Sequence, residues 1–231
     1  MTRHPISIVR LCWLCLSLIC PMTASAQEET KVVCRFLCLE NVAPPPLLCV
    51  SASGAEVACK VPAGAISGET TCFAVANTMT FLSMADRNPV ATAKIPADLK
   101  QVILVFVAGL KTPGALPWRV FVIEDTTANF PDGGAFVVNF HKQDIRSVVG
   151  NARNQLRPGG SLGIPLPQKR DDFNMAPVAV MFQDGEAWRT ASETMLRFLP
   201  GMRYLIFAYL DPTSGRPKVA TFQDTEVQKS P

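Results

Sequence analysis

The chain has 231 residues, of which 48% are hydrophobic and 18% are charged, with 22 basic and 19 acidic side chains. This near balance of charge gives no electrostatic basis for binding nucleic acid or an anionic membrane surface, so we exclude both from the expected functions. The length suits one large β domain or two small ones, and it is sufficient to bury a core without metal ions or disulfides.

Residues 1–26 have the pattern of a secretory signal peptide. Arg3 and Arg10 make the segment positive, residues 11–19 form an apolar core, and Ala24-Ser25-Ala26 supplies the small residues that signal peptidase requires. The apolar core is too short to favour a retained membrane helix, although an uncleaved N-terminal anchor is the alternative. Cleavage would leave 205 residues with 20 basic and 19 acidic side chains. We therefore expect a periplasmic or secreted protein that meets the membrane only through its transient signal peptide.

Five cysteines follow residue 26, and in an exported protein they predict one or two disulfides with a thiol left over. One unpaired cysteine and three pairings of the other four give fifteen arrangements. A three-residue hairpin loop centred on Gly54 would place Cys49 opposite Cys59, so Cys49–Cys59 is the predicted disulfide. A zinc site is one alternative, and buried thiols that pack as small apolar side chains are another. The five residues are Cys34, Cys38, Cys49, Cys59 and Cys72.

Short apolar segments between proline and glycine turns predict strands in the first half of the chain. Val102–Val107 is a run of six apolar residues that is too short to span a membrane. A half-buried strand would alternate with polar residues, so we expect this one to be buried on both faces at the centre of the fold. The other predicted strands are residues 31–40, 47–51, 55–61, 71–76, 78–84, 91–95 and 118–124.

Two turns and an alternating segment are the clearest features of the second half. Residues 129–133 predict a type I turn followed by a left-handed Gly133, and Arg157-Pro158-Gly159-Gly160 predicts a type II turn. Phe136, Val138 and Phe140 alternate with Val137 and Asn139, which predicts one buried and one exposed face. Residues 187–198 could be a strand or a short helix. The predicted strands are residues 135–140, 145–149, 161–167, 177–183, 187–198, 203–210 and 218–222.

These elements predict an all-β protein. No long apolar stripe has helical spacing, and 19 prolines and 14 glycines are scattered between short strands. This pattern is typical of an antiparallel β-sandwich, Ig-like or jelly-roll-like, with about 10–12 strands. We expect it to occupy residues 27–231, with a candidate internal boundary at residues 87–100 that separates the cysteine-bearing part from the rest.

Three short motifs resemble those of small exported all-β domains from uncharacterised bacterial families. They are the Phe130-Pro131-x-Gly133 turn, the strand ending Val138-Asn139, and Leu156-x-Pro158-Gly159-Gly160-Ser161. The resemblance covers about residues 90–225 and leaves out the cysteine-rich N-terminal part. It implies a β-sandwich fold and an exported location, and it implies no activity.

The polar residues give little indication of catalysis. His141 with Asp144 could form half of a nucleophile-activating pair, but no serine or cysteine has a nucleophile-elbow context, so we expect a strand-end histidine beside a turn. Acidic residues near turns could form a glycosidase pair or a calcium loop, yet turn-forming and solvating roles explain all of them. We therefore predict no catalytic residue, metal ligand or cofactor. The acidic residues are Glu124, Asp125, Asp171, Asp172, Asp184 and Glu186.

Trp118 and Trp188 are the candidate ligand-stacking residues, because a pair of tryptophans exposed on one face could stack on a sugar ring. Burial in or near the core is the commoner fate of such residues. We expect a non-enzymatic exported protein that acts by contact with a protein or glycan partner, as a binding or cell-envelope assembly module. A carbohydrate-binding or carbohydrate-active protein is the alternative.

Overall fold

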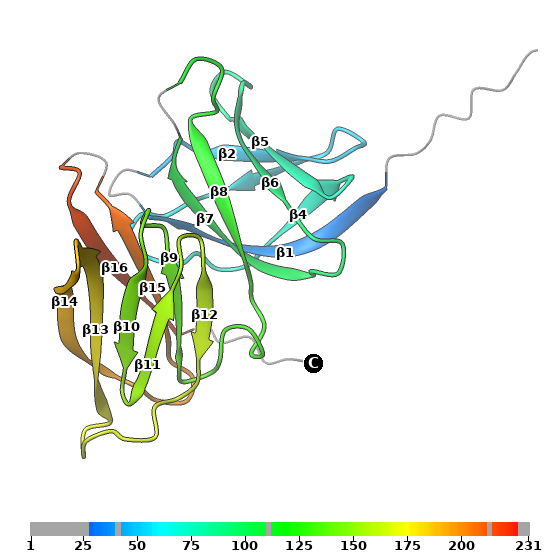
Figure 1. Cartoon of the computed structure of the whole chain (residues 1–231). Coiled ribbons are helices and arrows are strands. Elements are labelled where there is room, and N and C mark those ends of the chain that lie inside the picture. The colour runs from blue at the N-terminus through cyan, green and yellow to red at the C-terminus, as the bar shows by residue number, and fades with distance from the viewer. Residues whose placement is uncertain (1–27, 40–42, 110–111, 212–213, 226–231) are drawn as a thin grey trace, which may run out of the picture.

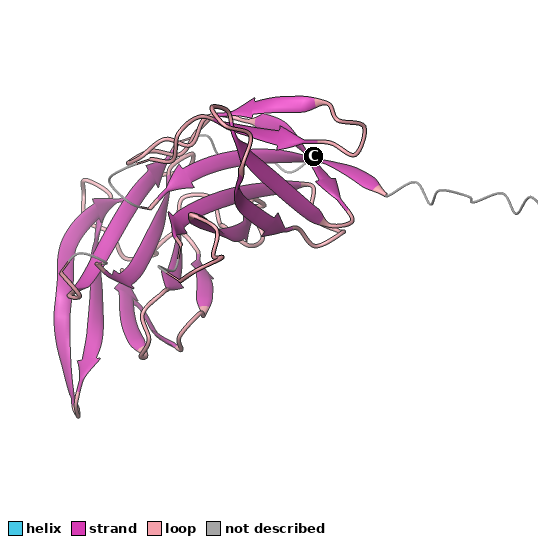
Figure 2. Cartoon of the chain, turned by 90° about the horizontal axis from the view of Figure 1, so that it is seen from above, coloured by secondary structure: helices cyan, strands magenta, loops and turns pink. Residues whose placement is uncertain are grey.

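A computed structural model describes residues 28–39, 43–109, 112–211 and 214–225 of the chain (Figure 1). Within these ranges the protein is all-β, with sixteen strands in three mostly antiparallel sheets and no helix (Figure 2). The predicted signal peptide, residues 1–26, and Glu40 at the end of the first predicted strand lie outside the described residues.

The N-terminal half forms one eight-stranded sheet in the order β3-β2-β5-β4-β1-β7-β8, with β6 paired to the free edge of β5. The sheet closes on itself, because β6 lies against β8, and the side chains that it encloses form a first core. Its strands are β1 (Glu29–Cys38), β2 (Leu47–Val50), β3 (Glu56–Cys59), β4 (Thr70–Val75), β5 (Thr78–Ser83), β6 (Pro89–Lys94), β7 (Gln101–Ala108) and β8 (Trp118–Glu124).

The C-terminal half forms two four-stranded sheets that face each other around a second core. The first sheet has the order β12-β9-β15-β16 and the second has the order β11-β10-β13-β14. The strands are β9 (Ala135–Asn139), β10 (Ile145–Val149), β11 (Ala152–Leu156), β12 (Ser161–Ile164), β13 (Met175–Asp184), β14 (Ala187–Arg197), β15 (Arg203–Leu210) and β16 (Pro217–Asp224).

A third core joins the two halves, because the sheet β12-β9-β15-β16 is covered on both faces. On β15, Ile206 points into the second core while Leu205 and Phe207 pack against β1, β7 and β8. The same division occurs on β7, where Leu104 lies in the first core and Ile103 in the third. The two parallel pairs, β1 with β7 and β9 with β15, are these doubly buried strands, as expected for parallel strands.

Four charged side chains are buried at one end of this third core. Arg35 and Arg203 alternate with Asp125 and Asp224, and each arginine contacts both aspartates. The four N–O distances are 3.3 Å for Arg35–Asp125, 2.5 Å for Arg35–Asp224, 2.5 Å for Arg203–Asp125 and 2.9 Å for Arg203–Asp224. We call these four residues the charge quartet. It is electrically neutral, and it ties β1 and the end of β8 to β15 and β16.

The prediction for Val102–Val107 is confirmed, because residues 102–106 are fully buried on β7. Two other expectations are wrong. The described residues form sixteen strands, which exceeds the predicted 10–12; fifteen of them coincide with predicted segments, and β11 was not predicted. Asn139 and Val137 are fully buried rather than exposed, because the second core covers that face of β9. Residues 187–198 form β14, so the helical alternative is wrong as well.

Candidate functional site

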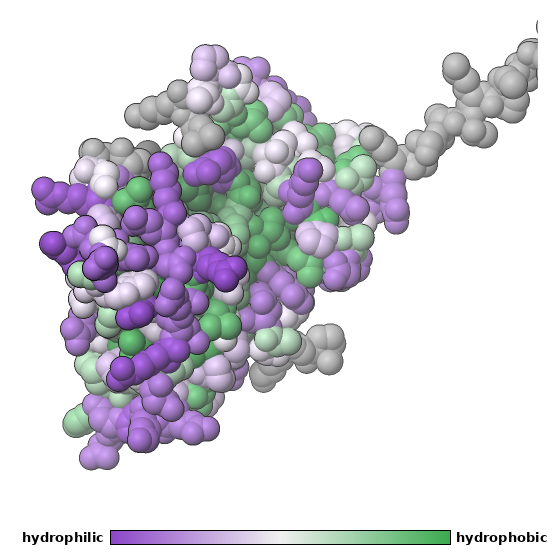
Figure 3. Space-filling view, viewed as in Figure 1, coloured by the Kyte–Doolittle hydropathy of each residue, from purple (hydrophilic) through white to green (hydrophobic). Residues whose placement is uncertain are grey.

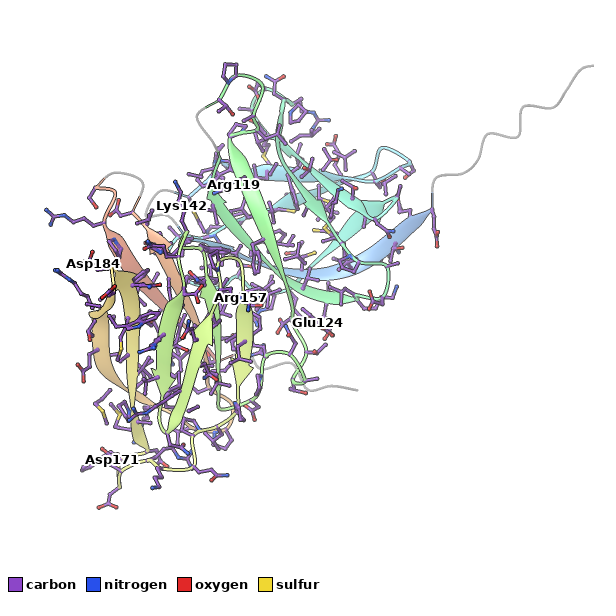
Figure 4. The ribbon with its side chains drawn as sticks, viewed as in Figure 1. Arg119, Glu124, Lys142, Arg157, Asp171 and Asp184 are labelled. Carbon is purple, nitrogen blue, oxygen red and sulfur yellow. The ribbon has the colours of Figure 1, made fainter. Side chains whose placement is uncertain are left out.

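A groove of about 510 Å³ opens at one end of the two C-terminal sheets. It lies where the β13–β14 hairpin extends beside the start of β16 and the link between β9 and β10. Lys142 and Asp184 mark this end of the C-terminal half (Figure 4). The groove is lined by His141, Gln143, Phe182, Gln183, Asp184, Arg189, Thr190, Ala191, Arg216 and Pro217.

His141 and Phe182 form the inner part of the groove, with ring centroids 4.7 Å apart in an edge-to-face arrangement. The backbone N–H of Gln143 donates to Nδ1 of His141 at 3.1 Å, which leaves the proton of the neutral ring on Nε2. Burial lowers the pKa of His141 below its ordinary value, and the positive charge of Lys142 lowers it further. The hydrogen bond from Gln143 raises the pKa but does not offset these two effects. The imidazole is therefore neutral at pH 7 and offers one N–H donor.

Asn139 holds His141 in place. Its Oδ1 accepts the backbone N–H of His141 at 2.8 Å, and its Nδ2 donates to the carbonyls of Gln143 at 2.9 Å and Leu156 at 3.0 Å. Three chain segments from two different sheets thus meet at one fully buried side chain. The position of the imidazole is set by this core residue rather than by the surface loop.

The outer part of the groove carries positive charge. Arg189 forms an exposed ion pair with Asp184 at 2.6 Å, so the charges of these two residues offset each other. Arg216 also lines the groove, and its guanidinium has no ion-pair partner among the described residues. The exposed Lys142 follows His141 directly. The groove therefore favours an anionic group, with the guanidinium of Arg216 as its free donor.

The structure does not bring His141 and Asp144 together as a pair. Asp144 accepts a hydrogen bond from Nε2 of Gln155 at 2.7 Å, while Nδ1 of His141 is occupied by Gln143. This arrangement supports a strand-end histidine beside a turn. Sequence reasoning missed Arg189 and Arg216 as groove residues, because the groove joins three parts of the chain that are distant in sequence: the link after β9, the β13–β14 hairpin and the start of β16.

The acidic residues near turns are dispersed. Figure 4 shows Glu124, Asp171 and Asp184 at separate places on the molecule. Asp171 accepts the backbone N–H groups of Phe173 and Met175, which is a turn-forming role, and Asp125 belongs to the buried charge quartet. Within the described ranges, no group of three or more His, Cys, Asp or Glu side chains is arranged to hold a metal ion.

The two tryptophans lie in different halves of the protein. Trp118, at the start of β8, packs against the first core. Trp188 lies on the sheet β11-β10-β13-β14, whose surface is mostly polar (Figure 3). The guanidinium of Arg146 lies over its ring, 4.2 Å from the centroid. The structure therefore does not place the two rings on one face, and one side of the Trp188 ring is already covered.

All five described cysteines are buried and none forms a disulfide, so the structure contains no Cys49–Cys59 bond. The register on which that disulfide depended is wrong, because Cys49 lies opposite Val57 and Cys59 lies opposite Leu47. The loop has five residues instead of three, and it is closed by hydrogen bonds from Ser51 N to Ala55 O and from Gly54 N to Ser51 O.

Comparisons with known proteins assign no family to this chain. No protein-family model matches the sequence, and no curated protein matches it. In the part of the chain that the structure describes, no apolar helix of membrane-spanning length occurs.

Proposed function

We propose that the chain is exported to the periplasm or beyond and acts there by contact, as a binding or envelope-assembly module that holds its partner in the groove beside His141. The observation that carries the proposal is the groove itself, which is lined by a neutral imidazole fixed by the buried Asn139 and by the guanidinium of Arg216, which forms no ion pair within the described part of the chain. The imidazole of this site is fixed before a partner arrives, which reduces the conformational entropy that His141 loses on binding.

The lining residues indicate what the partner presents. Arg216 provides a planar donor suited to a carboxylate, Gln143 and Thr190 provide further hydrogen-bonding groups, and Phe182 provides an apolar surface. The proposed partner is therefore a protein or glycan that carries a carboxylate next to an apolar group. The sheet arrangement supports a sandwich of Ig-like or jelly-roll-like type as the scaffold, with the groove at one end of its second core.

Carbohydrate binding at Trp188 is the second candidate. The ring is partly exposed on a polar sheet face, as in many sugar-binding surfaces, but Arg146 covers one of its sides. A neutral sugar would have to stack on the other side or displace the guanidinium. The two candidates therefore differ in the residue on which binding depends and in the charge of the ligand.

The test compares the wild-type chain with three variants on an array of uronic-acid oligosaccharides, neutral oligosaccharides and acidic peptides. Arg216→Glu reverses the charge in the groove, Trp188→Ala removes the exposed ring, and Arg157→Glu is the matched control at an exposed turn away from the groove (Figure 4). We expect binding to a carboxylate-bearing probe that Arg157→Glu retains and Arg216→Glu weakens by about tenfold or more, the loss expected for one charged hydrogen bond.

The binding should also weaken as salt is added, because the contact is largely electrostatic. Equal binding by the wild type and Arg216→Glu, or no binding to any carboxylate-bearing probe, would refute the proposal that the groove is the binding site. Binding of neutral sugars that only Trp188→Ala abolishes would establish the second candidate instead.

A further inference from the structure

The first core contains a cluster of thiols to which four strands of the eight-stranded sheet each contribute one sulfur. Cys34 in β1, Cys49 in β2, Cys59 in β3 and Cys72 in β4 are at most 2% exposed. Cys72 is at the centre, where its thiol interacts with those of the other three, and the sulfur of Cys34 also lies 3.8 Å from that of Met79. The binding groove lies in the other half of the protein and uses none of these residues.

The sulfurs of Cys59 and Cys72 lie close together. Their Sγ atoms are 3.6 Å apart, so the sulfurs would have to approach by about 1.5 Å to reach the length of an S–S bond. The two residues lie on strands that are not paired with each other, since β3 pairs only with β2, whereas β4 pairs with β1 and β5. A bond here would fasten a four-residue edge strand to the middle of the sheet.

We propose that Cys59 and Cys72 form a disulfide in the exported chain, and that Cys34, Cys38 and Cys49 remain thiols. The proposal relies on the export proposed above for the oxidising compartment. In the reaction, the two thiols lose two protons and two electrons as the S–S bond forms. The oxidant is of the disulfide class, a small disulfide or a protein disulfide oxidase, and its own S–S bond is reduced to two thiols by thiol–disulfide exchange.

The chemistry of the cluster indicates when the bond forms. Hydrogen bonds with Cys34, Cys49 and Cys59, and then burial, raise the pKa of Cys72 far above its ordinary value. The thiolate is the attacking species in exchange, so Cys72 loses its reactivity once the core is closed. Both sulfurs are at most 2% exposed in the closed core, so we expect the oxidant to reach them before the core closes and the bond to be shielded from reductants afterwards.

The test is to refold the purified chain without its predicted signal peptide, residues 27–231, in a mixture of reduced and oxidised glutathione. This separates bond formation from export and leaves out Cys12, Cys15 and Cys20. The free thiols are alkylated, the chain is cleaved after Lys, Arg and Glu, and cross-linked peptides are identified by mass spectrometry. Cleavage after Glu56 and Lys60 isolates Cys59 on Val57–Lys60, and cleavage after Glu69 and Arg87 isolates Cys72 on Thr70–Arg87. We expect these two peptides to be linked, with Cys34, Cys38 and Cys49 alkylated before reduction.

Three outcomes would overturn the proposal. The first is alkylation of both Cys59 and Cys72 without reduction, and the second is a cross-link that contains Cys49. The third is one bound zinc ion per chain after refolding in the presence of zinc. The Cys72→Ser variant should lack the link, and the thermal unfolding of this variant should not depend on reductant. Cys38→Ser, a substitution in the same core, should keep both the link and the dependence. Failure of the Arg216 test leaves these results unaffected, because the thiol cluster and the groove belong to different halves of the protein.

Discussion

The charge quartet is the most consequential feature at the scale of single residues. All four side chains are at most 2% exposed, and charges removed from water are stable only when paired and hydrogen-bonded. Burial alone would lower the pKa of Arg35, but hydrogen bonds and attraction to Asp224 and Asp125 together raise it, so its guanidinium stays charged. Arg203 also lies over the ring of Phe130, 3.9 Å from its centroid, and donates to its carbonyl.

Removing one member should therefore destabilise the protein strongly. Arg35→Met leaves two carboxylates with one guanidinium in the core, and we expect a loss of about 3–5 kcal/mol in the free energy of unfolding. The control is Arg87→Ala, which breaks the exposed pair with Glu56 and should change stability far less, because water screens that pair. Urea unfolding of both variants measures the difference. Similar losses from the two substitutions would contradict the buried arrangement.

His141 predicts how stability depends on pH. Because burial lowers its folded pKa, the unfolded chain binds this proton more readily than the folded one. The stability contributed by the neutral ring is fully present above about pH 6.5, the ordinary pKa of histidine, and is lost as the pH falls through the lowered folded value. The wild type should thus lose more stability than His141→Gln between pH 8 and pH 5 in urea unfolding. If the free energy of unfolding of the two chains changed with pH in parallel, the His141 ring would not be buried in its neutral form.

At the scale of elements, Asn139 connects the end of β9 to the link before β10 and to the end of β11. Asn139→Ala would leave one N–H and two carbonyls without their partner, and we expect it to destabilise the chain by at least about 2 kcal/mol. Asn154→Ala on β11 is the control, since the buried Nδ2 of Asn154 makes no hydrogen bond within the described residues. Thermal unfolding compares the two, and a larger effect of Asn154→Ala would rule out this role of Asn139.

Turn chemistry was predictable because it is local. Gly133 and Gly159 have φ values of +69° and +74°, and Gly160 N donates to Arg157 O as the predicted turn requires. The register of the β2–β3 hairpin was not predictable, because one further hydrogen-bonded turn within residues 51–55 shifts every cross-strand pair. β11 was missed since one of its faces is exposed and its sequence, Ala152–Leu156, is largely polar.

At the scale of the whole molecule, the sheet β12-β9-β15-β16 contributes side chains to the second core from one face and to the third core from the other. A continuous apolar run such as Val102–Val107 predicts double burial, but nothing in the sequence indicates which strands pair in parallel or which sheet covers which. These contacts join residues far apart in the chain, and the groove depends on them for the same reason. Its residues are brought together only after both C-terminal sheets have formed.

The third core supports a prediction on its packing. Phe207 is fully buried between Phe140 and Phe222, with ring centroids at 5.7 Å and 5.9 Å. Phe207→Ala should lower the free energy of unfolding by about 3–5 kcal/mol, because the cavity between two large sheets cannot close. The control Phe173→Ala removes a ring that is 71% exposed at a turn, and it should change stability by less than about 0.5 kcal/mol. Equal urea midpoints for the two variants would contradict the packing of the sheet β12-β9-β15-β16 in the third core.

Differential scanning calorimetry of the chain tests the central claim most directly, namely that the two halves are one folded body built on a common sheet. Because neither half can keep its inner strands buried without the other, we expect a single transition whose calorimetric and van't Hoff enthalpies agree. Arg35→Met and Phe207→Ala should move this transition without splitting it. Two separate transitions in the wild-type chain, one for each half, would contradict the account.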